Sequence, residues 1–405
     1  PAGTPARTAA RQRLEHHQQQ RGERCGEGRH DLDGTADTVT GMPVATPHLR
    51  VDLGRLRRNV RRVADQAAAA QISLRPHAKT HKSLEIARLQ LAMGARGLTV
   101  ATVGEAEAFV RGGCTDVFIA YPLWVDDARA ERLRDLAEQA RVAIGVDSVY
   151  SAANLRRRLG GTGVEVLVEV DSGHHRTGVR PKEAGEVARA AARVGLPVRG
   201  VFTFPGHGYS PGAAQEVVAA EAAALRRARE SVTAEGLEVQ VLSGGSTPTL
   251  AASLGDAGAG GSAAGADGVA RITELRPGVY VFGDAQQWEL GTTEPDDIAL
   301  TARATVVSHA GGRVVLDAGS KVLGADRAAY ATGYGRILDR PKARIVSLSE
   351  HHAVVEWPGR RPRLGTQVDV VPNHVCAAVN LADSMWVEEA GRLRPWPVAA
   401  RGLNS

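Results

Sequence analysis

The sequence contains very few cysteines. Its 405 residues include three, Cys25, Cys114 and Cys376, which are too few and too widely spaced for a disulfide framework. Chains without disulfides are typical of reducing compartments, so we expect a cytoplasmic protein. The chain also lacks any uninterrupted apolar run near the roughly 18 residues that a membrane span needs. Its N-terminus has no apolar signal core either, and we expect no membrane partner.

Basic residues are not clustered. The formal net charge is +5, and arginine-rich stretches such as RRRLGG and LRRARE mix Arg with Ala, Leu and Glu at helical spacing. This pattern is typical of solvated helix faces rather than of a nucleic-acid footprint, so we expect no nucleic-acid partner. With 43% hydrophobic residues, the chain can bury a core larger than that of one average domain.

Residues 1–45 are poor in branched aliphatic side chains and rich in Arg, Gln, Gly, His and Thr. Such a segment cannot bury enough apolar surface to offset its chain entropy, which predicts a disordered tail. A transit peptide is the alternative. It is disfavoured because the segment contains acidic residues, among them Glu15, Glu23, Glu27, Asp31 and Asp33.

From Leu49 onward, short apolar runs alternate with segments of helical period. The predicted strands are 71–76, 98–102, 117–121, 142–147, 164–170, 198–204, 239–243 and 279–283. Eight strands, nearly all followed by a helix, predict an α/β fold, a (β/α)8 TIM-like barrel over residues 46–288. An open doubly wound sheet is the alternative, but it more often has about five or six strands.

Residues 289–390 have a different sequence pattern. They form short apolar runs with Gly, Pro and Asp between them and little helical period, which predicts a C-terminal all-β domain. The segment 46–53, just ahead of a helix predicted over 54–70, is a candidate additional strand of that domain.

The stretch LRPHAKTHKS follows the first predicted strand and surrounds Lys79 with Arg75, His77, His81 and Lys82. In barrels of this kind the active site lies on the loops after the strands, so we expect Lys79 on that rim. A lysine crowded by cations and partly desolvated is a usable nucleophile and base. The alternative is a surface lysine at a helix start, where the helix dipole disfavours a cation.

The loop SGGSTPT follows the seventh predicted strand. Gly244 and Gly245 would let backbone amides approach an anion, and Ser246 and Thr247 would add hydroxyl donors at a helix start. Barrel phosphate sites commonly lie after strands seven and eight, so we expect a phosphate site here. A Gly-Ser linker is the alternative, but a linker would not normally end one strand and cap one helix.

A rim lysine and a phosphate loop across one barrel mouth are the pair that pyridoxal 5′-phosphate needs, an amine for its aldehyde and donors for its phosphate. On these motifs the chain resembles the alanine-racemase-type (fold-type III) pyridoxal-phosphate enzymes, in the branch containing D-threonine aldolase and D-serine dehydratase. The resemblance runs from about Thr46 to Leu381. It implies that Lys79 bonds covalently to the cofactor, with the neighbouring basic residues holding it poised beside an anion.

Three further segments carry the resemblance. HHRTGV matches the segment whose arginine, here Arg176, lies near the cofactor ring, and GHGY resembles the segment that supplies a tyrosine to the pyridine side, here Tyr209. ELRPGVYVFGD resembles the end of the barrel in that branch, with Tyr280 near the phosphate. The resemblance therefore implies these three residues as cofactor ligands beside the phosphate loop.

The motif VVPNHVCAAVNL contains His374 and Cys376, two residues apart, whose side chains would share one face of an extended segment. Imidazole and thiolate suit zinc, with water or substrate in the remaining positions; a buried cysteine beside a satisfied histidine is the alternative. The resembling branch places its metal site here. Its dehydratases have the His-x-Cys form, and its aldolases usually have His and Asp, which suit manganese or magnesium. Cys376 therefore favours zinc and the dehydratase side.

The resemblance implies a PLP- and metal-dependent lyase that acts on a D-3-hydroxy amino acid. Cys376 favours β-elimination, as in D-serine dehydratase, to a 2-oxo acid and ammonia; retro-aldol cleavage to glycine and an aldehyde, as in D-threonine aldolase, is the alternative. A non-catalytic PLP-carrying barrel is a third reading, but such proteins lack the second β domain and the metal pair. The family also implies a homodimer. The run EHHA at 350–353 departs from the Glu-Glu-His-Gly common in the branch.

Overall fold

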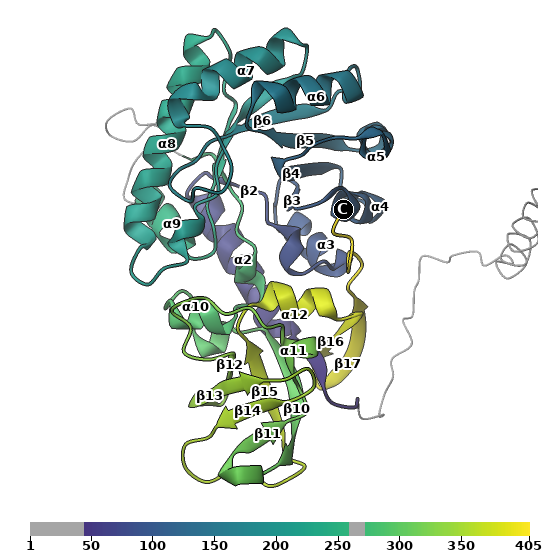
Figure 1. Ribbon diagram of the computed structural model, residues 1–405, viewed down its shortest axis with the longest axis vertical. Coiled ribbons are helices and arrows are strands. Elements are labelled where there is room, and N and C mark those ends of the chain that lie inside the picture. The colour runs from purple at the N-terminus through teal and green to yellow at the C-terminus, as the bar shows by residue number, and fades with distance from the viewer. Residues whose placement is uncertain (1–43, 259–271) are drawn as a thin grey trace, which may run out of the picture. The chain divides into compact units, whose positions relative to one another are not determined.

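The computed structural model describes residues 44–258 and 272–405 (Figure 1). The tail predicted over 1–45 lies almost wholly outside the described residues. Within these two ranges, none of the helices combines the length and apolar character that crossing a bilayer requires.

Eight short parallel strands form a barrel. Their order in the sheet is β2–β9–β8–β7–β6–β5–β4–β3, and a parallel bridge between His77 and Thr99 joins the two ends. The strands are β2 (Ser73–Leu74), β3 (Leu98–Val100), β4 (Asp116–Pro122), β5 (Arg141–Val146), β6 (Glu165–Glu169), β7 (Val198–Phe202), β8 (Val241–Gly244) and β9 (Glu274–Leu275). The predicted (β/α)8 barrel is therefore confirmed.

Helices alternate with the strands and cover the outside of the barrel (Figure 1). They are α2 (Leu53–Ala69), α3 (Leu84–Ala92), α4 (Val103–Arg111), α5 (Asp127–Gln139), α6 (Val149–Leu159), α7 (Ala184–Arg193), α8 (Ala214–Ala234) and α9 (Leu250–Gly258). Side-chain caps set several starts: Asp52, Thr102 and Asp126 each accept a hydrogen bond from the backbone N–H three residues on. The helix predicted over 54–70 agrees with α2 to within one residue.

The strand predicted over 279–283 is wrong. Val279–Val281 forms a 3-10 helix, η4, and the eighth strand lies earlier, at Glu274–Leu275. The run VYV is apolar because it is buried in the turn after the strand, whereas β9 begins with a glutamate. Glu274 is buried because Arg75 pairs with it inside the barrel, so no apolar period marks the strand.

The C-terminal part is a nine-stranded sheet with the order β11–β14–β13–β12–β15–β10–β1–β16–β17, which confirms the all-β prediction. Its strands are β1 (His48–Asp52), β10 (Leu300–Ser308), β11 (Val314–Leu316), β12 (Gly335–Ile337), β13 (Arg340–Leu348), β14 (Ala353–Glu356), β15 (Gln367–Pro372), β16 (Ser384–Glu389) and β17 (Arg392–Pro397). The candidate strand at 46–53 is β1, which pairs antiparallel with β10 and parallel with β16.

Three short helices belong to this C-terminal part: α10 (Ala285–Glu289), α11 (Ser320–Leu323) and α12 (Val375–Leu381). In Figure 1, α12 lies between the sheet and the barrel. It contacts the 3-10 turn η1 (Ala78–Thr80), which follows β2 and carries Lys79. The fold therefore brings a segment near residue 376 to the first loop of the barrel rim.

Candidate active site

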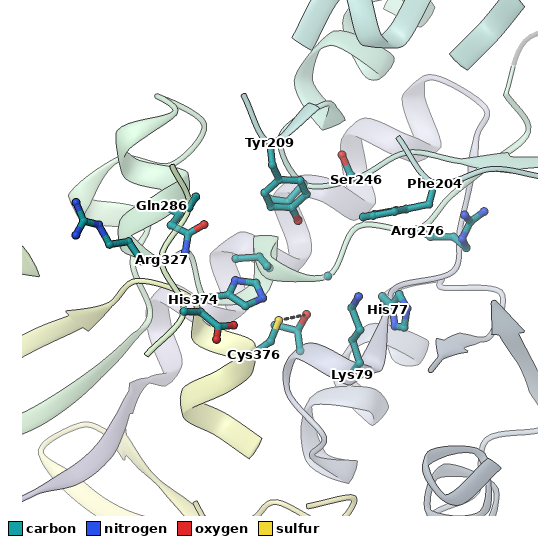
Figure 2. Close-up of a pocket in the computed structure, with 16 residues that line it drawn as sticks. His77, Lys79, Phe204, Tyr209, Ser246, Arg276, Gln286, Arg327, His374 and Cys376 are labelled. Atoms are coloured by element: carbon teal, nitrogen blue, oxygen red, sulfur yellow. Dashed lines mark hydrogen bonds between the residues drawn. The ribbon is translucent and has the colours of Figure 1, made fainter. Parts of the chain in front are cut away.

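A cavity of about 490 Å³ lies on the rim of the barrel, where α12 meets it (Figure 2). Six of the predicted site residues line it: Lys79, Tyr209, Ser246, Thr247, His374 and Cys376. These residues come from three barrel loops and from the start of α12. The structure thus brings the lysine, the phosphate-type loop and the proposed metal pair into one space.

Lys79 lies in η1, directly after β2, and its Nζ is 5.8 Å from the centroid of the Phe204 ring. His77 lines the same cavity and is half-buried, with its Nδ1 sealed from solvent. Burial, reinforced by the positive charge of Lys79, holds the pKa of His77 well below its usual value, so this ring is neutral. Lys79 therefore has an aromatic face and a neutral imidazole beside it.

The predicted crowd of basic residues around Lys79 does not form. Arg75 points into the barrel, where its Nε lies 2.8 Å from Glu274. His81 is fully buried, and the Nζ of Lys82 lies 3.3 Å from Glu105. Arg75 and Lys82 are held by buried carboxylates, because a buried charge is stable only when paired. His81 pairs with Gln90 at 3.2 Å. Only His77 of the four neighbours lines the cavity.

The loop after β8 has the shape of an anion cradle. Gly245 has φ +77°, in the left-handed region that favours glycine, and a Cβ on Gly244 would collide with the carboxylate of Glu221. Ser246 and Thr247 then line the cavity. The two glycines are required here because the backbone turns sharply against α8 just before it reaches the cavity.

Several polar atoms at this end of the cavity lack a partner among the described residues. They are the backbone N–H groups of Thr247 and Gly278 and the buried Nδ1 of His77. Gly278 also lines the cavity, and a Cβ on it would lie 2.5 Å from Thr80 Oγ1. Unpaired backbone donors in a glycine-rich cradle fit a phosphate group, and an unpaired imidazole nitrogen fits a polar aromatic ring.

The three softer cofactor predictions have different outcomes. Tyr209 lines the cavity, and burial raises the pKa of its phenol, so it is protonated. Arg176 does not line it, although its guanidinium carbon lies 5.0 Å from the Phe204 ring centroid. The Tyr280 hydroxyl accepts a hydrogen bond from Gln90 at 3.1 Å, outside the cavity. Tyr280 contacts the phosphate-type loop through its backbone N–H, which donates to a threonine hydroxyl at 3.2 Å.

His374 and Cys376 do not lie on an extended segment. His374 is the N-cap of α12 and Cys376 is in its first turn, yet both side chains line the cavity because the chain changes direction at the cap. The negative charge of Cys376 raises the pKa of His374 well above its usual value, against burial. Burial alone would raise the pKa of Cys376, but the charge and hydrogen bond of His374, together with Lys79 and Thr80, outweigh burial and lower that pKa. The Cys376 Sγ also lies 3.3 Å from Thr80 Oγ1.

Asp284 orients the imidazole of His374. This carboxylate is fully buried, and its Oδ2 lies 3.3 Å from His374 Nδ1. Its oxygens also accept from the backbone N–H groups of Gln287 at 2.8 Å and Val375 at 3.2 Å. The Nε2 of His374 is thereby left for a ligand, the arrangement typical of metal-binding histidines. Over 44–258 and 272–405, no group of three or more metal-binding side chains is assembled, so His374 and Cys376 would be protein ligands of an open site.

The sequence interpretation missed Arg276, Asp284, Gln286 and Arg327, of which all but Asp284 line the cavity. Arg276 donates to Ser243 Oγ and to a backbone carbonyl. The misplaced eighth strand hid it, since a strand at 274–275 puts Arg276 on the rim. In the run EHHA at 350–353, the first three residues are exposed and Ala353 begins β14; none of the four lines the cavity.

Family comparisons agree with this architecture. A family model described as the alanine racemase N-terminal domain matches residues 51–286, and one described as a putative serine dehydratase domain matches residues 299–387. The two matches cover the barrel and most of the nine-stranded sheet.

Individual relatives span nearly the whole chain. D-threo-3-hydroxyaspartate dehydratase of Delftia sp. (strain HT23) is 32% identical over 84% of this chain and 92% of its own length. D-threonine aldolase of Arthrobacter sp. is 33% identical over 90% of this chain and 95% of its own. The solved structure of the Delftia sp. HT23 enzyme superposes with a TM-score of 0.78 at 31% identity, covering 87% of this chain and 97% of that one.

Proposed function

The chain belongs to the fold-type III pyridoxal-phosphate enzymes, among the lyases of D-hydroxy amino acids, and we propose that it is a metal-assisted dehydratase of D-3-hydroxy amino acids. One observation carries the proposal: Lys79, the glycine-rich loop at 244–247, His374 and Cys376 line the same cavity. A carrier barrel without catalysis would need neither His374 nor Cys376.

The loop residues Ser246 and Thr247, with the free backbone N–H of Gly278, would hold the cofactor phosphate. Pyridoxal phosphate, when bound, supplies an electron sink for the α-carbon of the substrate. Lys79 would hold the cofactor covalently in the resting enzyme and, once released by substrate, remove the α-proton. His77 is adjacent and neutral, so it places no second positive charge beside Lys79.

Tyr209 and Arg176 would border the cofactor ring from the loops after β7 and β6. The protonated Tyr209 hydroxyl can donate a hydrogen bond into the cavity. Arg176 would act from above the Phe204 ring rather than from the cavity wall. Tyr280 would support the phosphate loop through its backbone alone.

His374 Nε2 and Cys376 Sγ would hold a divalent metal, which would supply a Lewis acid for the β-hydroxyl of the substrate. The imidazole–thiolate donor set favours zinc over manganese or magnesium. The same cysteine favours elimination over aldol cleavage, because the dehydratases of the resembling branch have the His-x-Cys form. Retro-aldol cleavage is the second candidate, since one of the aligned relatives is an aldolase.

The reaction test uses the full chain with pyridoxal phosphate and zinc. We expect D-serine or D-3-hydroxyaspartate to give a 2-oxo acid and ammonia, and a chelator to suppress that turnover. Glycine and an aldehyde from D-threonine, with no ammonia from any substrate, would contradict the dehydratase assignment. Borohydride reduction should label Lys79, and the Lys79→Ala variant should remain unlabelled.

We also propose the division into a barrel over 46–288 and a β domain over 289–390. The sheet of the second part also takes in β1 from before the barrel and β17, which ends at Pro397. A cytoplasmic location and a homodimer remain predictions. Cys114 and Cys376 are both free thiols, which is consistent with a reducing compartment. Light scattering on the purified chain tests the dimer.

A further inference from the structure

A buried carboxylate lies directly behind the loop proposed to bind phosphate. Glu221 is on α8 and is 2% exposed. Its Oε1 accepts a hydrogen bond from the backbone N–H of Gly245 at 2.7 Å. Gly245 immediately precedes Ser246 and Thr247, which line the cavity. Glu221 therefore holds the loop from the side opposite to the ligand.

The contact between Glu221 and the loop is close. A Cβ on Gly244 would collide with Glu221 Oε1, so the loop backbone packs directly against the Glu221 side chain of the helix. The loop is held on its other side by Thr249, whose Oγ1 accepts from Ser246 N–H at 3.0 Å. A change in the charge or length of residue 221 is therefore transmitted directly to the residues that face the phosphate.

The charge at this position opposes the proposed ligand. The Glu221 carboxylate, hydrogen-bonded to the residue just before Ser246 and Thr247, would repel a phosphate dianion held by that loop. The low polarisability of the protein interior strengthens the repulsion. Arg276 is buried in the same cavity and offsets part of it. A proton on Glu221 would remove the repulsion and leave Oε1 free to accept from Gly245.

We propose that Glu221 is a positioning residue of the phosphate loop and that it takes up one proton when phosphate binds. The inference rests on the proposed function, because it assumes that the loop at 244–247 holds the cofactor phosphate. It extends that function by making cofactor affinity depend on pH through a group that does not touch the cofactor.

The surroundings of Glu221 support this behaviour. Burial raises its pKa to about 7, against the Gly245 hydrogen bond and the charge of Arg276, so its protonation changes near neutral pH. Of the charged and titratable groups on elements packed against α8, Arg189 of α7 and Arg199 of β7 are paired with other carboxylates. His207 of η3 (Gly206–Gly208) lies against Gly173. Arg276 is the charged side chain that acts on Glu221 most strongly.

The test measures how tightly the full chain binds pyridoxal 5′-phosphate between pH 6 and pH 8. Protein stripped of cofactor is titrated with pyridoxal 5′-phosphate, and binding is monitored by absorbance. From pH 6 to pH 8, we expect the dissociation constant of the wild type to rise about tenfold more than that of Glu221→Gln. A factor of this size is what one group that titrates near pH 7 produces when only its protonated form favours binding. The ionisation of the cofactor itself is common to both proteins and cancels in this comparison. Glu216→Gln, an exposed change on the same helix, is the matched control and should follow wild type.

A second variant separates position from charge. Glu221→Ala removes the acceptor for Gly245 N–H and should bind the cofactor more weakly than Glu221→Gln at every pH, with circular dichroism confirming the fold. Equal affinities of these two variants would overturn the positioning role. Parallel pH profiles of wild type and Glu221→Gln would overturn the proton uptake while leaving the proposed function intact. Failure of the wild-type chain to take up pyridoxal phosphate at any pH would overturn both.

Discussion

Replacing Arg75 by methionine should destabilise the barrel more than any single surface change. Arg75 is 1% exposed, and its Nε lies 2.8 Å from Glu274. Its two terminal nitrogens reach the two carboxylate oxygens of Asp116 at 2.7 and 3.1 Å. One guanidinium therefore ties β2 to β9 and to β4 across the barrel interior.

The expected cost of Arg75→Met is about 3–5 kcal/mol in the free energy of unfolding, because the change leaves buried carboxylates without their partner. Asp116 keeps Arg199 at 3.7 Å, so the larger uncompensated charge is that of Glu274. The double variant Arg75→Met/Glu274→Gln should regain at least about 1 kcal/mol, since its glutamine carries no charge and can still accept from Ser243 Oγ.

Urea unfolding followed by circular dichroism measures these differences. Arg141→Met is the matched control, because Arg141 pairs with Glu165 while its side chain is 42% exposed. Exposed pairs contribute at most about 1 kcal/mol. An unfolding free energy of Arg75→Met within about 1 kcal/mol of wild type, or no recovery in the double variant, would refute the reasoning.

The same variant predicts a pH dependence. Burial alone would raise the pKa of Asp116, but the hydrogen bonds and charge of Arg75 outweigh it and lower that pKa. A carboxyl whose folded-state pKa is lowered contributes stability above its unfolded value, and the contribution is lost as pH falls through the folded value. The stability gap between wild type and Arg75→Met should therefore narrow below pH about 4. A gap that widens on acidification would contradict this assignment.

Three further changes test the site and its support. Gly278→Ala would place a methyl group 2.5 Å from a threonine hydroxyl and should weaken pyridoxal-phosphate binding at least about tenfold by absorbance titration, whereas Gly255→Ala, in open space, should not. Cys376→Ala should lower zinc content and D-serine turnover about 10–100-fold while leaving bound cofactor unchanged; retained zinc would count against the metal pair. Asn380→Leu removes the acceptor 2.7 Å from the buried ammonium of Lys82 and should cost about 1–3 kcal/mol in urea unfolding, and no loss would show that water replaces it.

Alternating apolar runs and helical segments were enough to predict the barrel, because burial on one face imposes a period that is visible in sequence. The loops carrying Lys79 and SGGSTPT could be placed on the rim for the same reason, since each directly follows a strong strand signal. The prediction failed at β9, where a buried Glu274 replaces the expected apolar residue. That error displaced the eighth strand and hid Arg276.

Tertiary structure alone decided how charges near Lys79 are used and which segments meet at the cavity. Arg75 and Lys82 look like cavity cations in sequence, yet their partners, Glu274 and Glu105, lie on other elements, β9 and α4. The approach of Cys376 to the Lys79 turn likewise depends on packing between α12 and η1. Local sequence reports periodicity and turn chemistry, whereas the partner of a buried charge is set by contacts between distant segments.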